Sequence, residues 1–164
     1  MIDEIEPLLD LVAIPVAPAR YRILVVDADA GMRRLLAAGL PRQGFTVSVA
    51  ADGQEAADLV RANRPPIDLI LMDVGMPGRG GPATLAALRA LHPQLRCCFM
   101  SGDLGGHTEA GLRLLDTGAV LRKPFSMDAA GRALRAEINR REGEDAAQDD
   151  HWRDDGGQGQ RPVP

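Results

Sequence analysis

The sequence predicts an α/β fold, a doubly wound sheet of five parallel strands with helices on both faces. Short apolar runs alternate along the chain with segments of helical periodicity, which is the pattern of repeated strand-helix-strand units. Each apolar run is compact and suited to burial on both faces of a sheet. With 164 residues, of which 45% are hydrophobic, the chain is long enough for one domain with its own core.

Five apolar runs are the predicted strands. They are Ile23–Val26, Thr46–Val49, Ile67–Met72, Cys97–Met100 and Ala119–Leu121. The predicted helices lie between and after them, and cover Met32–Leu40, Gln54–Ala62, Pro82–Leu91, Glu109–Leu115 and Met127–Arg140. Pro41 ends or kinks the first helix, and Pro65 and Pro66 close the second. Right-handed crossovers between parallel strands place such helices on both faces of the sheet.

The chain divides into three parts. Residues 1–19 form an N-terminal extension, in which Pro15 and Pro18 stop a short helical pattern. Residues 20–142 hold all the predicted strands and helices and form the domain. Residues 143–164 are an acidic tail with too few apolar side chains to fold, and we expect this tail to be disordered. Since no second set of elements follows the domain, its output is expected to be a contact with another protein.

The composition excludes several classes of function. Seven acids and two arginines lie between residue 142 and the end, so the rest of the chain is nearly neutral, and 3% of the residues are aromatic. Both features argue against nucleic-acid binding. No apolar run approaches the roughly 20 residues of a membrane span, and the first residues are acidic, so we expect a cytoplasmic protein without membrane contact. The adjacent Cys97 and Cys98 are expected to be reduced core residues, because a disulfide between neighbours would be strained.

Chemically active side chains follow four of the predicted strands. Asp27 comes directly after the first strand, Asp73 after the third, Ser101 after the fourth, and Lys123 two residues after the fifth. Parallel strands end at one edge of the sheet, where open sheets bind their ligands, so we expect these side chains to lie together. Lys123 is also the only lysine among 19 basic residues, which favours a site that needs a compact ammonium group.

These residue types suit the acceptor site of a phosphoryl transfer. Such a transfer needs an oxygen nucleophile, a hard divalent cation and positive charge around the transferred oxygens. Asp73 is the expected nucleophile, and Ser101 and Lys123 are expected to bind the transferred group. Asp27, Asp73 and the main-chain carbonyl of Gly75 are the expected ligands of Mg²⁺.

Five segments resemble the receiver domain of response regulators, the flavodoxin-like module of two-component signalling. They are Ile23–Asp27, Asp52-Gly53, Asp68–Gly81, Met100-Ser101-Gly102 and Lys123-Pro124-Phe125, and the resemblance covers about residues 20–142. It implies that Asp73 accepts a phosphoryl group from a histidine kinase or a histidine phosphotransfer protein, with Mg²⁺ as cofactor. It also implies that Asp27 belongs to the acidic pocket, that Ser101 is the switch hydroxyl, and that Lys123 binds phosphate and precedes a cis proline bond. Such a module is not an enzyme, although it promotes its own phosphorylation and dephosphorylation.

Two positions depart from the receiver pattern. Receivers usually carry two adjacent acids after the first strand, but here Ala28 follows Asp27, so the affinity for Mg²⁺ is expected to be reduced. Asp29 can compensate as a metal ligand or can cap the next helix, and its capping preference favours the second role. The position three residues before Lys123 is usually aromatic but is Val120 here, so an aromatic switch is not available to report phosphorylation.

Two other functions stay open at this point. A degenerate receiver that acts as a phosphorylation-independent docking module would explain both departures, whereas the retained aspartate, serine and lysine favour a working phosphoacceptor. A phosphatase of the haloacid dehalogenase type would use Asp27 as its nucleophile and Asp29 as its acid, but no further acidic metal ligands follow a strand beyond Lys123. The sequence does not identify the kinase, the downstream partner or the oligomeric state.

Overall fold

In the computed structural model, which describes residues 20–62 and 66–154, five parallel strands form one sheet in the order β2-β1-β3-β4-β5. The strands are β1 (Tyr21–Val26), β2 (Phe45–Ala50), β3 (Leu69–Asp73), β4 (Cys97–Ser101) and β5 (Val120–Arg122). The helices are α1 (Ala30–Gly39), α2 (Gly53–Ala62), α3 (Gly80–Leu91), α4 (Glu109–Arg113) and α5 (Met127–Asp154), with a short 3-10 helix η1 (Leu40–Gln43) after α1. The doubly wound α/β fold predicted from the sequence is confirmed.

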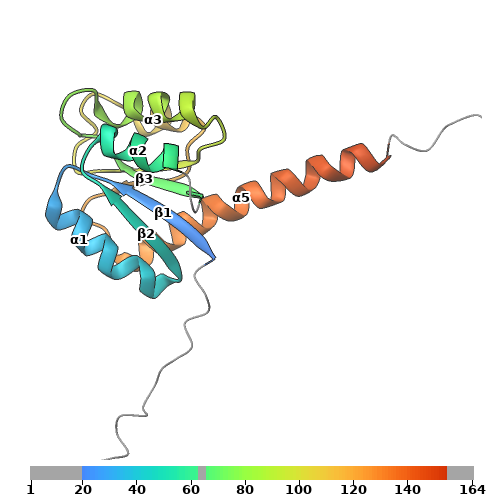
Figure 1. Ribbon diagram of the computed structural model, residues 1–164, viewed down its shortest axis with the longest axis horizontal. Coiled ribbons are helices and arrows are strands. Elements are labelled where there is room, and N and C mark those ends of the chain that lie inside the picture. The colour runs from blue at the N-terminus through green and yellow to red at the C-terminus, as the bar shows by residue number, and fades with distance from the viewer. Residues whose placement is uncertain (1–19, 63–65, 155–164) are drawn as a thin grey trace, which may run out of the picture.

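The sheet has a separate core on each face, because alternate residues of a strand point to opposite sides. Helices α2 and α3 cover one face, and α1 and α5 cover the other (Figure 1). On the first face Leu24 and Val26 pack in one cluster with residues of α2, α3 and α4, and on the second Ile23 and Val25 pack in another with residues of α1 and α5. This burial on both faces explains why β3 and β4 read as continuous apolar runs.

The two adjacent cysteines lie on strand β4 of the sheet. Cys97 and Cys98 are free and fully buried on opposite faces of β4. Burial raises the pKa of the Cys98 thiol to about 12. Both side chains are therefore protonated core residues, as the sequence predicted.

The strand order determines where the site lies. Strand β1 has β2 on one side and β3 on the other. Helix α1, which follows β1, covers one face of the sheet, and α3, which follows β3, covers the opposite face, so the loops after β1 and β3 diverge. A ligand of an open α/β sheet binds at such a point, beyond the carboxyl ends of the strands.

The C-terminal helix is longer than predicted. Helix α5 continues from Met127 to Asp154 and projects from the body of the domain, whereas the sequence predicted an end near Arg140 and disorder from residue 143 (Figure 1). The disorder prediction therefore differs from the structure as far as Asp154. Residues 1–19, 63–65 and 155–164 lie outside the described residues, and with them the predicted extension and the end of the tail. Neither α5 nor another described helix is long and apolar enough to span a membrane.

A local ion pair supports the first additional turn of α5. Arg140 contacts Glu144 one turn further along, at 2.8 Å between Nη1 and Oε1, which is a stabilising i,i+4 pair. Gly143 opposes helix formation by only about 1 kcal/mol relative to alanine. One glycine is therefore too weak a signal to stop a helix that the domain has already nucleated.

Candidate functional site

Asp27 and Asp73 lie side by side at the carboxyl ends of the two central strands. Val26 of β1 pairs with Met72 of β3, so Asp27, directly after β1, and Asp73, the last residue of β3, lie at the same level of the sheet. Both aspartates are buried, with 2% of Asp27 and 9% of Asp73 exposed to solvent. Two carboxylates so close in a buried position require a cation.

Lys123 supplies that cation. Its Nζ lies 2.8 Å from Oδ2 of Asp27 and 3.0 Å from Oδ1 of Asp73, so one ammonium bridges both carboxylates. Burial alone lowers the pKa of Lys123, but the hydrogen bonds to Asp27 and Asp73 outweigh this effect and raise the pKa above its usual value. The bond between Lys123 and Pro124 is cis, as the sequence predicted. The site therefore holds two negative groups and one permanent positive group.

Ser101 lies at the same edge of the sheet, at the end of β4. Its main-chain carbonyl accepts a hydrogen bond from the N–H of Lys123 at 2.9 Å, which joins it to the loop that holds the ammonium. Its buried hydroxyl donates to the carbonyl of Asp103, in the loop that follows β4. The fold thus brings Asp27, Asp73 and Lys123 into direct contact and places Ser101 beside them, with its hydroxyl engaged by its own loop.

Asp29 caps helix α1. Its Oδ1 accepts a hydrogen bond from the N–H of Met32 at 3.0 Å, as an N-cap side chain does. Hydrogen bonds from the amides of Met32 and Gly31 lower the pKa of this carboxyl. Its own N–H donates to Oδ1 of Asp27 at 2.8 Å. Of the two roles that the sequence left open for Asp29, the structure shows the cap.

The ligands available at the site fit a divalent cation, although they are fewer than in receivers with two adjacent acids. Asp27 and Asp73 offer two carboxylates, and Gly75 borders the second, since a Cβ on Gly75 would lie 3.6 Å from Oδ2 of Asp73. Ala28 offers no side-chain ligand. Among residues 20–62 and 66–154, no three His, Cys, Asp or Glu side chains are grouped to hold a metal ion. Mg²⁺ can nevertheless bind through one or two carboxylates when water completes its shell.

The turn after β3 depends on Gly81. A Cβ at this position would lie 2.5 Å from the main-chain oxygen of Asp73 and 3.0 Å from Cα of Val74. The N–H of Gly81 also donates to the carbonyl of Val74 at 3.0 Å. A residue without a side chain is therefore needed for α3 to begin so close to Asp73.

The sequence reasoning missed Arg33. Its Nη1 donates to the main-chain carbonyls of Asp27 at 2.7 Å and of Ala28 at 2.9 Å, so it contacts the turn that carries the first aspartate. A signal for this contact was present in the sequence. Arg33 follows the capping residue Asp29 by four positions, which places it on the same side of the first helical turn.

Comparisons with known proteins agree on one family. The model of the response regulator receiver domain matches residues 23–135. The response regulator MprA of Mycobacterium bovis (strain BCG / Pasteur 1173P2) is 36% identical over 130 residues, which cover 77% of this chain and 54% of that protein. The chain thus spans about half the length of the curated relatives that it matches.

Solved structures give the same result. The receiver domain of the hybrid histidine kinase CckA is 31% identical with a TM-score of 0.58, and the match covers 71% of this chain and 98% of that one. A response regulator from Burkholderia pseudomallei, solved with a phosphorylated aspartic acid, a calcium ion and citrate, is 25% identical with a TM-score of 0.62. That match covers 78% of this chain and 74% of the other.

Proposed function

The chain belongs to the response regulator receiver domain family of two-component signalling, and from this premise we propose that Asp73 accepts a phosphoryl group from the phosphohistidine of a sensor kinase or a phosphotransfer protein. One observation carries the proposal: a single ammonium, that of Lys123, bridges the Asp73 and Asp27 carboxylates where β1 and β3 end. In the transfer, a carboxylate oxygen of Asp73 attacks phosphorus and forms the new P–O bond. The P–N bond breaks, its electron pair stays on the imidazole, and that nitrogen takes up a proton.

The residues around Asp73 have separate tasks in this transfer. Lys123 already contacts the acceptor carboxylate, and its raised pKa keeps it cationic, so it is placed to neutralise the phosphoryl oxygens. Ser101 is placed to bind the same group once its hydroxyl leaves the carbonyl of Asp103. Asp27 holds the other side of the ammonium and keeps it beside the acceptor.

A divalent cation is part of this proposal. When bound by Asp27, Asp73 and the carbonyl of Gly75, Mg²⁺ would supply positive charge at the transferred oxygens. The similar response regulator from Burkholderia pseudomallei was solved with both a phosphorylated aspartic acid and a calcium ion, which is consistent with a role for a hard cation. Because Ala28 offers no ligand and Asp29 serves as a cap, we expect weaker Mg²⁺ binding than in receivers with two adjacent acids.

A second candidate is a receiver fold that docks to a partner without phosphorylation. The use of Asp29 as a cap favours it, because the acidic pocket then contains only Asp27 and Asp73. Val120 also favours it, since this side chain is partly buried against the core and is not an aromatic switch. The phosphatase alternative has no such support, because the family match points elsewhere and Asp29 is bound to the first turn of α1.

Intact-mass spectrometry with a small-molecule phosphodonor tests the proposal. We expect the wild type to gain one phosphoryl group in the presence of Mg²⁺, and the Asp73→Asn variant to gain none. Asp58→Asn is the matched control, because Asp58 is an exposed aspartate on α2 that contacts Gln54 and Arg61 of the same helix. If the wild type gains no mass at any Mg²⁺ concentration, the docking module becomes the better description.

A further inference from the structure

The turn between β1 and α1 is held by a closed set of hydrogen bonds. The N–H of Asp29 donates to Oδ1 of Asp27 at 2.8 Å, while Oδ2 of Asp27 accepts from Lys123 at 2.8 Å. The N–H of Asp27 donates to the carbonyl of Ala50 at 3.2 Å. The two remaining main-chain carbonyls of the turn, those of Asp27 and Ala28, both accept from Nη1 of Arg33. The direction of the Asp27 carboxylate therefore depends on the conformation of this turn.

Arg33 is the only one of these partners that is not part of the strand, the turn or the ion pair. It extends back from the first turn of α1 and is partly buried, whereas the side chain of the next residue, Arg34, is exposed. One nitrogen of Arg33 donates to two successive carbonyls, at 2.7 and 2.9 Å. A hydrogen bond from a charged donor to a carbonyl is stronger than one from a neutral donor, so this contact restrains both peptide planes of the turn.

We propose that Arg33 is a positioning residue: by clamping the carbonyls of Asp27 and Ala28, it fixes the Asp27 carboxylate in the direction that binds Lys123 and a divalent cation. The proposal rests on the function given above, in which Asp27 is a metal ligand. In this chain the orientation of the Asp27 carboxylate is especially important, because Ala28 cannot replace a misdirected Asp27 as a metal ligand. Residues that orient a metal ligand usually change metal affinity roughly 10-fold or more when they are removed.

The sign of the effect separates positioning from simple electrostatics. Arg33 carries a positive charge close to the acidic pocket, so its removal should strengthen cation binding if charge alone mattered. If Arg33 positions Asp27, its removal should weaken cation binding instead. The same loss of charge at Arg34 provides the electrostatic control, because that side chain is exposed and the carbonyls of Asp27 and Ala28 accept from Arg33 instead.

Nuclear magnetic resonance titration of the full chain with MgCl₂, without a phosphodonor, tests the proposal. We expect Arg33→Met to bind Mg²⁺ roughly 10-fold more weakly than the wild type, and Arg34→Met to bind it at least as tightly. A second readout needs no metal: the amide of Asp29, which donates to Asp27, should exchange with solvent several-fold faster in Arg33→Met. Arg33→Gln, which keeps a polar side chain that is too short to reach both carbonyls, is expected to behave in the same way and covers the event that Arg33→Met does not fold.

Two outcomes would overturn the proposal. One is an Mg²⁺ affinity in Arg33→Met equal to or above that of the wild type, and the other is an unchanged exchange rate at the Asp29 amide. If the wild type itself does not bind Mg²⁺, the exchange rate of the Asp29 amide alone tests whether Arg33 positions Asp27. Failure of the wild type to accept a phosphoryl group would count against the proposed function, and it would leave both of these readouts in place.

Discussion

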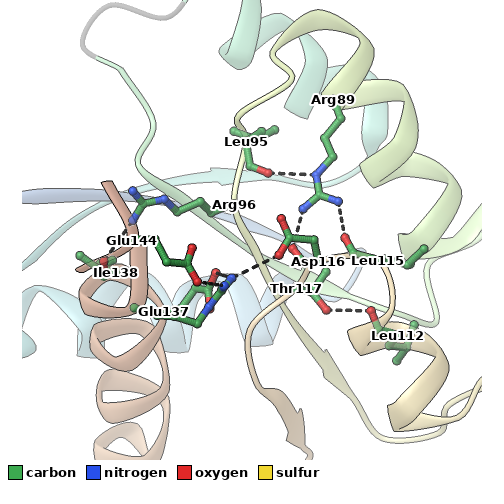
Figure 2. Close-up of polar contacts among 11 residues, drawn as sticks. Arg89, Leu95, Arg96, Leu112, Leu115, Asp116, Thr117, Glu137, Ile138 and Glu144 are labelled. Atoms are coloured by element: carbon green, nitrogen blue, oxygen red, sulfur yellow. Dashed lines mark hydrogen bonds and ion pairs between the residues drawn. The ribbon is translucent and has the colours of Figure 1, made fainter. Parts of the chain in front are cut away.

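Two clusters of charged side chains tie loops to the sheet, one at each edge. The carboxyl-edge cluster consists of Asp27, Asp73 and Lys123. The amino-edge cluster lies where β4 and β5 begin and consists of Arg89, Asp116, Glu137 and Arg140 (Figure 2). Both contain a buried carboxylate, but they differ in how its charge is balanced.

In the amino-edge cluster every buried charge has a matching partner. Glu137 is 3% exposed, and Arg140 approaches it with two nitrogens, Nε at 3.0 Å and Nη2 at 2.9 Å. Arg140 also reaches Oδ1 of Asp116 at 3.4 Å. From the other side, Arg89 of α3 donates to the carbonyls of Asp116 at 2.9 Å and of Leu95 at 3.0 Å, and also to that of Leu115 (Figure 2). Asp116, whose φ of 52° is in the left-handed region, is thus held from both sides.

The carboxyl-edge cluster is balanced less completely. Two carboxylates share the single ammonium of Lys123, so one negative charge remains without a matching cation in the cluster. A lysine ammonium is a compact point charge, whereas the forked guanidinium of Arg140 fits one carboxylate with two bonds. The comparison indicates that the amino-edge cluster fixes structure, while the carboxyl-edge cluster keeps a capacity to bind a further cation.

Breaking the amino-edge cluster should have the largest effect on stability. Arg140→Met leaves the Glu137 carboxylate buried without its partner, and we expect the free energy of unfolding to fall by about 2 kcal/mol. This is less than for a fully buried pair, because the Arg140 side chain is 40% exposed and solvent screens the interaction. Urea denaturation followed by circular dichroism measures the change.

A double variant shows whether that loss comes from the unpaired charge. Glu137→Met combined with Arg140→Met removes both charges, and we expect it to recover most of the stability, because apolar side chains can replace a buried ion pair. Glu144→Gln, which changes only the exposed partner of Arg140, should change the stability by less than about 0.5 kcal/mol. Equal losses in the single and double variants would instead assign the effect to packing of the Arg140 side chain.

Removing the cation of the carboxyl-edge cluster should have a smaller effect, and one that metal can reverse. We expect Lys123→Met to lose about 1 kcal/mol: the two carboxylates then repel each other, but uptake of a proton or a cation by one of them limits the loss. Addition of Mg²⁺ should restore part of this stability in Lys123→Met. Arg122→Met is the matched control, since the neighbouring Arg122 is exposed and pairs with the partly exposed Glu109. A loss in Lys123→Met that Mg²⁺ does not reduce would contradict cation binding at the carboxyl edge.

The stability that Lys123 contributes should also depend on pH. The hydrogen bonds to Asp27 and Asp73 raise the pKa of folded Lys123 above the ordinary value of 10.5, despite the opposing effect of burial. A group whose pKa is raised on folding contributes its full stabilisation below the unfolded pKa and loses it as the pH rises through the folded pKa. The stability difference between the wild type and Lys123→Met should therefore be constant between neutral pH and 10.5 and should decrease above it. A decrease that begins near neutral pH would show that another group titrates.

The two clusters also differ in how far the sequence predicted them. Asp27, Asp73, Ser101 and Lys123 each follow a recognisable strand, and the parallel sheet alone brings such positions to one edge. The contacts around them were harder to predict from the sequence, because Arg33 and the capping carboxylate of Asp29 act through the geometry of one turn.

The amino-edge cluster was not predicted at all. Its members come from α3, the loop before β5 and α5, and they meet only after these elements pack on the sheet. Two neighbouring helices also end at other residues than the sequence predicted. Helix α4 ends at Arg113 rather than Leu115, since the chain turns at Asp116 in a left-handed conformation. Helix α5 continues past Arg140 because side-chain pairs such as that with Glu144 oppose the single glycine at position 143.

The smallest effect is expected at Asp29, which lies beside the carboxyl-edge cluster and acts as a cap. Asparagine caps helices as well as aspartate does, so Asp29→Asn should leave the melting temperature nearly unchanged and should weaken Mg²⁺ binding only slightly, through the loss of one nearby negative charge. Asp29→Ala, in contrast, removes the acceptor of the Met32 amide and should lower the melting temperature while Mg²⁺ binding persists. Thermal denaturation and a titration with MgCl₂ give both quantities for the same samples. A loss of Mg²⁺ affinity of roughly 10-fold or more in Asp29→Asn would mean that this carboxylate replaces the acid missing at Ala28, and the acidic pocket would then contain three carboxylates instead of two.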